Sequence, residues 1–302
     1  MSMTPLIQRI FPGFPYPHAE SCRILQRGFR RLRYHIEGAD NIPTEGPVLL
    51  IMNHTGWEEV LLTILSARRP IKFVGIHEEL YLDEELSWER LFETVHFDNM
   101  GPRGRALCKL LGRQLGDAIR QQLLAFGFIP THVRSHIRGL HVGTNGFREV
   151  MRCLAEGEMV VLFPEGGIHR QGEMLPFRPG LGLILRRAER MGIPLKVLPA
   201  GQHCAGAVSW TLGTAFEPRL VYGQPLQLSG AGQAAAEFDR FVTRHLQEQV
   251  HALMVRAWAP AAPPPQSYHQ THWNTVDWEA GPEQDRLRRQ GRQSGRTSVG
   301  DL

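Results

Sequence analysis

The stretch "VLLIMNHTGWEEV", residues 48–60, runs from five apolar residues through an Asn-His pair to two glutamates. An apolar run without polar alternation is typical of a strand buried on both faces, as in a parallel sheet covered by helices. The glutamates lie in a segment, residues 57–68, whose pattern predicts a helix. His54 therefore stands where a strand ends and a helix is expected to begin, the position at which α/β sheets place their chemistry.

Short apolar runs and helical patterns continue to alternate along the chain. Further strands are predicted at residues 71–76, 126–130, 159–163, 195–200 and 219–226. Further helices are predicted at residues 105–124, 144–155, 180–191 and 234–258. Apolar strands separated by helices predict an α/β fold, with a mainly parallel or mixed sheet flanked by helices.

Composition divides the chain into three segments. Residues 1–36 form a basic N-terminal segment, residues 37–258 the folded domain and residues 259–302 a flexible tail rich in Pro, Arg and Gln, with too little apolar surface to order itself. Within the domain, the charged residues 77–104 are long for a connection, and we expect an insertion that caps the site. The last predicted helix carries an apolar stripe for the core: Phe238, Phe241, Val242, Leu246, Leu253 and Trp258.

The N-terminal segment predicts contact with a membrane surface. In residues 22–36, Leu25, Phe29, Leu32 and Ile36 recur at helical spacing among arginines, which is the pattern of an amphipathic helix in an anionic headgroup layer. The alternative is a helix packed on the domain with its arginines in water. No apolar run approaches the roughly 18 residues of a spanning helix, and prolines interrupt the region where a signal peptide is apolar. We expect a cytoplasmic protein that is peripherally associated with membranes.

Missing patterns disfavour several classes of protein. The sequence has no GxSxG elbow, Walker loop or GxGxxG motif, which argues against serine hydrolases, P-loop enzymes and dinucleotide oxidoreductases. Its four cysteines lie far apart without CxxC pairing, so neither a zinc site nor a disulfide framework is expected. His132 and His136 could share a helix face, but they lack a nearby carboxylate or cysteine ligand, and we expect no metal. The arginine-rich ends contain no recognisable nucleic-acid module, so no nucleic-acid partner is expected.

His54 and Glu59 have the spacing of a histidine held by an acid. If the helix begins near Gly56, the Glu59 carboxylate can turn back and hold one ring nitrogen as a hydrogen-bond donor, which leaves the other nitrogen to take a proton. Such a pair activates a hydroxyl without a covalent enzyme intermediate. The alternative is an acid that favours a helix first turn beside an incidental histidine.

A second polar constellation follows another buried strand. In "VVLFPEGGIHR", residues 160–170, Pro164 stops the strand ladder and the glycines let the backbone approach a ligand closely. Glu165 is then expected at the same edge of the sheet as His54. The alternative is a plain Gly-rich turn with a solvated acid, because Pro-Glu-Gly-Gly is also good turn chemistry.

Together, these motifs resemble the glycerolipid acyltransferase superfamily, which includes the lysophospholipid and 1-acylglycerol-3-phosphate acyltransferases. "NHTGWEE" is similar to the family's first motif, an Asn-His with an Asp after four further residues, and "LFPEGG" to its third, Phe-Pro-Glu-Gly. "GADNIPTEGPVLLIMNH" is similar to the lead-in, "GFIPTHVR" to the second motif, "EMLPFRPGLGLIL" to the segment after the third and "GIPLKVLPA" to the fourth. The resemblance covers residues 37–201 in order.

The resemblance implies an enzyme of phospholipid biosynthesis. The reaction would be acyl transfer from acyl-CoA or acyl carrier protein to a hydroxyl of a lysophospholipid, with 1-acylglycerol-3-phosphate giving phosphatidate as the family's default. His54 would be the general base and Glu59 would replace the Asp that orients it. Glu165 and Gly166 would bind the acceptor, and Pro199 would lie near the acyl donor. No metal or bound cofactor is implied.

Departures from the family pattern leave the acceptor open. The arginines that contact the acceptor phosphate in the family align here with Val133 and Ile168. A different lysolipid or an amino lipid is therefore an alternative acceptor, and a non-catalytic lipid-binding relative is an alternative function. The substrate-binding candidates are Asn53, Arg134, Glu165, Gly166, Gly167, Arg170, Arg178 and Pro199.

Overall fold

The computed structural model describes residues 4–29, 33–54, 58–76, 102–131, 144–166, 174–178, 180–203 and 218–258. All of these residues belong to one compact unit, Met1–Pro264. Most of the expected insertion, residues 77–101, and the whole expected tail, residues 259–302, lie outside the described residues. The three predicted segments therefore stay predictions.

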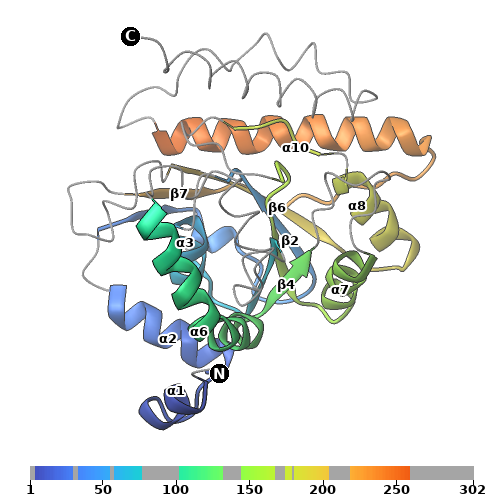
Figure 1. Cartoon of the computed structure of the whole chain (residues 1–302). Helices are drawn as coiled ribbons and strands as arrows, with labels where there is room; N and C mark the ends of the chain where they lie inside the picture. Colours follow the sequence, from blue (N-terminus) through green and yellow to red (C-terminus); the bar gives the residue numbers. More distant parts are fainter. Residues whose placement is uncertain are drawn as a thin grey trace, which may run out of the picture. The chain divides into compact units, whose positions relative to one another are not determined.

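A single mixed sheet forms the centre of this unit (Figure 1). Its seven strands lie in the order β1 (His35–Glu37), β7 (Arg219–Tyr222), β6 (Lys196–His203), β2 (Val48–Met52), β5 (Met159–Leu162), β3 (Ile71–Ile76) and β4 (Phe128–Thr131). Neighbouring strands are parallel except for β6 and β7, which are antiparallel. The predicted α/β fold with a mainly parallel sheet is confirmed.

The helices occupy the segments in which apolar residues recur at helical spacing. They are α1 (Thr4–Ile10), α2 (His18–Phe29), α3 (Glu58–Ser66), α6 (Pro102–Phe126), α7 (Thr144–Ala155), α8 (Gly180–Arg190) and α10 (Ala235–Trp258), with a short 3-10 turn at Ala39–Asn41. The prediction for residues 144–155 matches α7 at both ends. The other predicted helices differ from the observed ones by a few residues at their ends, where helix termini are least defined by pattern.

The pleat of the sheet divides its buried side chains between two layers. Leu50 and Met52 of β2 belong to a cluster with Leu62 of α3, and Leu25 of α2 packs against the same cluster. Successive side chains of a strand point to opposite faces, so Gly201 of β6, which follows the clustered Ala200, faces the other layer. There α10 packs so closely that a Cβ added at Gly201 would collide with the helix backbone. Helix α3 and helix α10 therefore cover opposite faces of the sheet.

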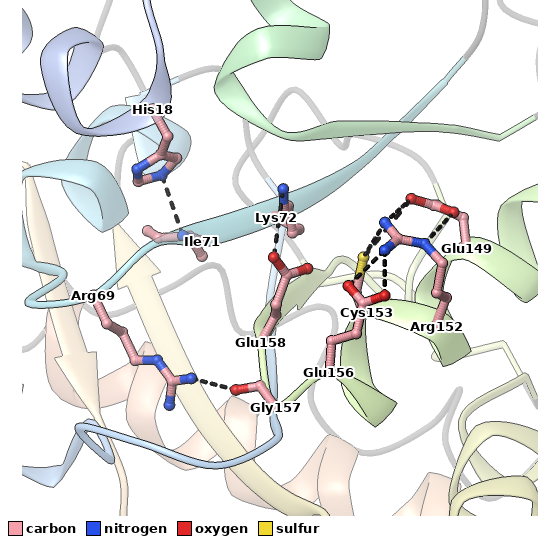
Figure 2. A network of polar contacts seen from close by, with 10 residues as sticks. All are labelled: His18, Arg69, Ile71, Lys72, Glu149, Arg152, Cys153, Glu156, Gly157 and Glu158. Carbon is pink, nitrogen blue, oxygen red and sulfur yellow. Dashed lines mark hydrogen bonds and ion pairs between the residues drawn. The ribbon is translucent and has the colours of Figure 1, made fainter.

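The amino edge of the sheet, where β2, β3 and β5 begin, is joined by polar contacts (Figure 2). Arg69 Nη2 donates to Gly157 O at 2.5 Å. His18 Nε2 on α2 accepts the Ile71 N–H at 3.1 Å. Burial, followed by the charge of Lys72, lowers the pKa of His18, which favours the neutral ring that this hydrogen bond requires. The His18 contact attaches α2 to the edge opposite the one at which His54 lies. Figure 2 also draws the ion pairs Lys72–Glu158, Arg152–Glu149 and Arg152–Glu156.

Three sequence predictions are corrected by the fold. The amphipathic helix predicted to reach Ile36 ends at Phe29, because Ile36 pairs with Leu220 in the sheet. Phe126 completes α6 instead of opening a strand, since Gly127 turns the chain with a φ of 112° before β4 begins. Phe241, assigned to the core stripe of the last helix, is 51% exposed.

Candidate functional site

The carboxyl ends of β2 and β5 bring the two polar motifs together. The two strands are parallel neighbours, and Ile51 lies opposite Leu162 in their register. The Asn-His pair after β2 and the Pro164–Gly166 turn after β5 therefore leave the sheet at the same edge, as the two motifs predicted.

His54 is held by a hydrogen bond at one ring nitrogen and by stacking on one face of its ring. Its Nδ1 lies in a short hydrogen bond with Glu59 Oε1, and its ring stacks on Phe163 with centroids 4.2 Å apart and planes at 18°. Glu59 is wholly buried, whereas the His54 side chain is 20% exposed. When Nδ1–H donates to the carboxylate, Nε2 carries the ring's lone pair. The pair can therefore accept a proton at Nε2 and stabilise the resulting imidazolium.

Glu165 is buried and bonds to two backbone amides. Its Oε1 accepts the His54 N–H at 2.6 Å, and its Oε2 accepts the Leu175 N–H at 2.5 Å. The side chain is 0% exposed, so the alternative of a solvated turn acid is wrong. The carboxylate instead joins the His54 turn to the segment at residues 174–178.

The turn that carries Glu165 is crossed by Arg178. Gly166 has a φ of 61°, and a Cβ at this position would collide with the Arg178 side chain. Arg178 N donates to Pro164 O at 2.8 Å, and Arg178 Nε donates to Glu165 O at 3.3 Å. The glycine thus leaves room for the side chain of Arg178, an exposed residue, over the turn whose Glu165 bonds to the His54 backbone.

Asn53 is bonded to a residue that the sequence analysis did not select. Its side chain is wholly buried and forms hydrogen bonds with Gln202 of β6. The only sequence signal for Gln202 was a polar residue following the apolar run at residues 195–200. Pro199, the other candidate on β6, pairs with Ile51 inside the sheet and accepts the Gly223 N–H at 2.8 Å.

His203 is a buried histidine at the end of β6. Its ring contacts Trp258 of α10, with centroids 3.9 Å apart. Burial, followed by the positive charge of Arg219, lowers the pKa of His203 to about 4. His203 is therefore neutral at neutral pH and lies on the α10 face, away from the α3 face that supplies Glu59.

The remaining candidates cannot be placed. Arg134, Gly167 and Arg170 lie outside the described residues, as do His132 and His136. Among the residues that the structure does describe, no group of three or more His, Cys, Asp or Glu side chains could hold a metal ion. The expectation that the reaction needs no metal or cofactor stays a prediction.

Part of the chain that forms this site is similar to a known protein family. Residues 109–201 match a family model described as Acyltransferase. This segment of the chain is therefore similar to acyltransferases. The match confirms the resemblance predicted from the motifs, and with it an acyltransferase enzyme. It begins within α6 and ends within β6, so it includes the Glu165 turn and does not include His54.

A solved structure is also similar to this chain. The structure is that of the 1-acyl-sn-glycerophosphate (LPA) acyltransferase PlsC from Thermotoga maritima, with 17% sequence identity and a TM-score of 0.43 over 76% of this chain and 78% of that chain. No curated protein matches the sequence.

Proposed function

We propose that the protein transfers an acyl group from acyl-CoA or acyl carrier protein to a hydroxyl of a lysophospholipid. The preferred acceptor is 1-acylglycerol-3-phosphate, and the product is then phosphatidate. One observation carries the proposal. His54 is the partly exposed member of a pair whose other member, Glu59, is buried, at the strand edge where this fold class places chemistry. The pair lies beside the turn that belongs to the Acyltransferase match.

The proposed reaction uses His54 first as a base and then as an acid. His54 Nε2 takes the proton of the acceptor hydroxyl while its oxygen attacks the thioester carbonyl. The tetrahedral intermediate then collapses, the carbon–sulfur bond breaks, and the departing thiolate takes the proton from the imidazolium. Glu59 stabilises the imidazolium between these steps, because its carboxylate is already bonded to Nδ1.

The assay that tests this function offers labelled acyl-CoA and acyl carrier protein, separately, to a panel of lysolipids. We expect one acceptor class to be acylated, and we expect His54→Gln to lower kcat by about 10²- to 10⁴-fold, the usual contribution of a general base. His245→Gln, on α10 and outside the site, is the matched control and should retain activity. If lipid binds but no acceptor is acylated, the domain is a non-catalytic lipid-binding relative.

Arg178 is the proposed phosphate-binding group. The family's arginine position after the third motif is taken here by Ile168, but Arg178 returns a guanidinium to the same turn, where its Nε bonds to Glu165 O. An exposed guanidinium can meet a phosphate with two parallel hydrogen bonds. Gly166 supports this role, because it leaves the space that Arg178 occupies.

Replacement of Arg178 should therefore act on the acceptor. For Arg178→Ala we expect KM for lysophosphatidate to rise about tenfold or more, the effect of losing a charge-assisted hydrogen bond, while KM for the acyl donor is unchanged. Arg187→Ala, an exposed arginine on α8, is the matched control. An unchanged acceptor KM in Arg178→Ala would assign phosphate binding elsewhere and favour a different lysolipid or an amino lipid as acceptor.

Membrane contact is proposed for a different surface from the one that the sequence indicated. Leu25 packs against the core cluster, and Ile36 lies in the sheet, so these two residues of the predicted apolar stripe belong to the domain. Exposed apolar side chains instead lie on α1 and on α6, which pack against each other. With basic residues among them, the two helices fit an anionic membrane. The apolar members are Leu6, Ile10, Leu107 and Leu110, with Phe11 directly after α1, and the basic ones are Arg9, Arg103, Arg105 and Lys109. In the described parts of the chain, no helix is long and apolar enough to cross a bilayer.

Vesicle binding tests this surface. For Leu107→Ser combined with Leu110→Ser we expect binding to phosphatidylglycerol-containing vesicles to fall about tenfold or more, since each buried Leu contributes about 1.5 kcal/mol or more. Leu183→Ser, an exposed leucine on α8, is the control and should bind normally. Equal vesicle binding by the double variant and the control would contradict the assignment of α6 to the membrane.

A further inference from the structure

Gln202 lies where β2 leaves the sheet and β6 continues. Met52 opposite Ala200 is the last pair between these two strands. On its other side, β6 still pairs with β7, and Gln202 lies opposite Leu220. The N–H and C=O of one residue in a strand point to the same side, so the backbone groups of Gln202 that face β2 have no further strand to meet.

The side chain of Asn53 takes the place of that missing strand. Its Oδ1 accepts the Gln202 N–H at 2.8 Å, and its Nδ2 donates to Gln202 O at 3.1 Å. Only an amide side chain offers an acceptor and a donor in this way, as a peptide group does. Both residues are wholly buried, where an unpaired peptide group is costly. The Asn53 side chain is therefore fully bonded to the backbone of β6.

The side chain of Gln202 then returns to the peptide bond that precedes His54. Gln202 Nε2 donates to Asn53 O at 3.2 Å. The N–H of the same peptide group belongs to His54 and donates to Glu165 Oε1 at 2.6 Å. The C=O is therefore held from β6 and the N–H from the turn after β5, on the two sides of β2 in the sheet order.

We propose that Gln202 is a positioning residue for acyl transfer, which holds the Asn53–His54 peptide plane and thereby aims the His54 imidazole. The inference rests on the proposed function. Gln202 acts through the backbone, since the plane of this peptide sets the direction in which the His54 side chain leaves the chain. A displacement of a reacting group by about 1 Å can cost about 10²-fold in rate, so a tilt of this plane is enough to impair catalysis.

The test variant removes the amide donor of Gln202 and keeps a side chain of similar volume. In Gln202→Met the two hydrogen bonds from the Asn53 side chain to the backbone can persist, while the donor to Asn53 O is lost. We expect kcat to fall about 10- to 100-fold with the KM of both substrates unchanged. The matched control is Gln224→Met, because Gln224 Nε2 also donates to an asparagine, Asn41 Oδ1, at 3.1 Å, but at an exposed site.

A second readout needs no turnover. The His54 Nδ1 proton, bonded to Glu59, should give a low-field NMR resonance that is absent in His54→Gln. We expect Gln202→Met to shift this resonance or broaden it by exchange with water, and Gln224→Met to leave it in place. If the native protein acylates no acceptor, the proposed function fails, while the resonance still decides whether Gln202 positions His54.

Gln202→Asn is a second test variant, for use if Gln202→Met does not fold. It keeps an amide in the buried site but withdraws it by one methylene from Asn53 O. Loss of kcat and a perturbed resonance in a folded Gln202→Asn support the positioning role as well. Native kcat and a native resonance in either folded variant, or a rise in KM with kcat unchanged, would overturn it.

Discussion

The hydrogen bond from the His54 backbone N–H to Glu165 is the contact on which the candidate site depends. It joins the chain that leaves β2 to the chain that leaves β5, beyond the point where these two parallel strands pair in the sheet. Because both strand ends are fixed by the ladder, the bond fixes where His54 stands above the sheet edge. Phe163, one residue after β5, then supplies the flat surface on which the imidazole rests.

Two buried carboxylates surround this histidine, and each has a different task. Glu59 meets the ring at Nδ1, whereas Glu165 uses both oxygens on backbone amides. Burying a carboxylate is costly unless hydrogen bonds replace its water, and the His54 turn supplies a donor to each of them. Glu59 and Glu165 hold His54 in place, and each in turn receives a hydrogen bond from it. The His54 turn, the Glu165 turn and helix α3 therefore stabilise one another.

The sequence predicted those parts of the molecule in which local pattern decides structure. Strands β2 and β3 were predicted with their observed bounds, because continuous apolar runs between turn residues admit few alternatives. The proximity of His54, Glu59 and Glu165 also followed, since parallel strands bring their carboxyl ends to one edge. The helix predicted to reach Ile36 failed because sheet pairing outweighed helical spacing. Phe241 failed because it lies off the helix face that Phe238 and Val242 bury.

The roles of Gln202 and Arg178 required the structure. Gln202 lies 149 positions from Asn53 in the chain, and only the strand order β6–β2–β5 brings it to the peptide before His54. Arg178 was out of register with the family's motif and reaches the turn because Gly166 leaves room for it. Such contacts depend on register and on the space left by a missing side chain, which a single sequence does not encode in any local pattern.

The central claim is that a buried carboxylate orients His54 for proton transfer, and Glu59→Gln tests it most directly. This change keeps the size of the side chain, removes its charge and offers Nδ1 a mixed donor and acceptor. The measurement is kcat for acylation of the preferred lysolipid, with Glu237→Gln, an exposed acid in the first turn of α10, as the control. The account predicts a loss of about 10³-fold or more in kcat with little change in KM, by analogy with an orienting aspartate in a catalytic triad. A folded Glu59→Gln protein with native kcat would contradict it.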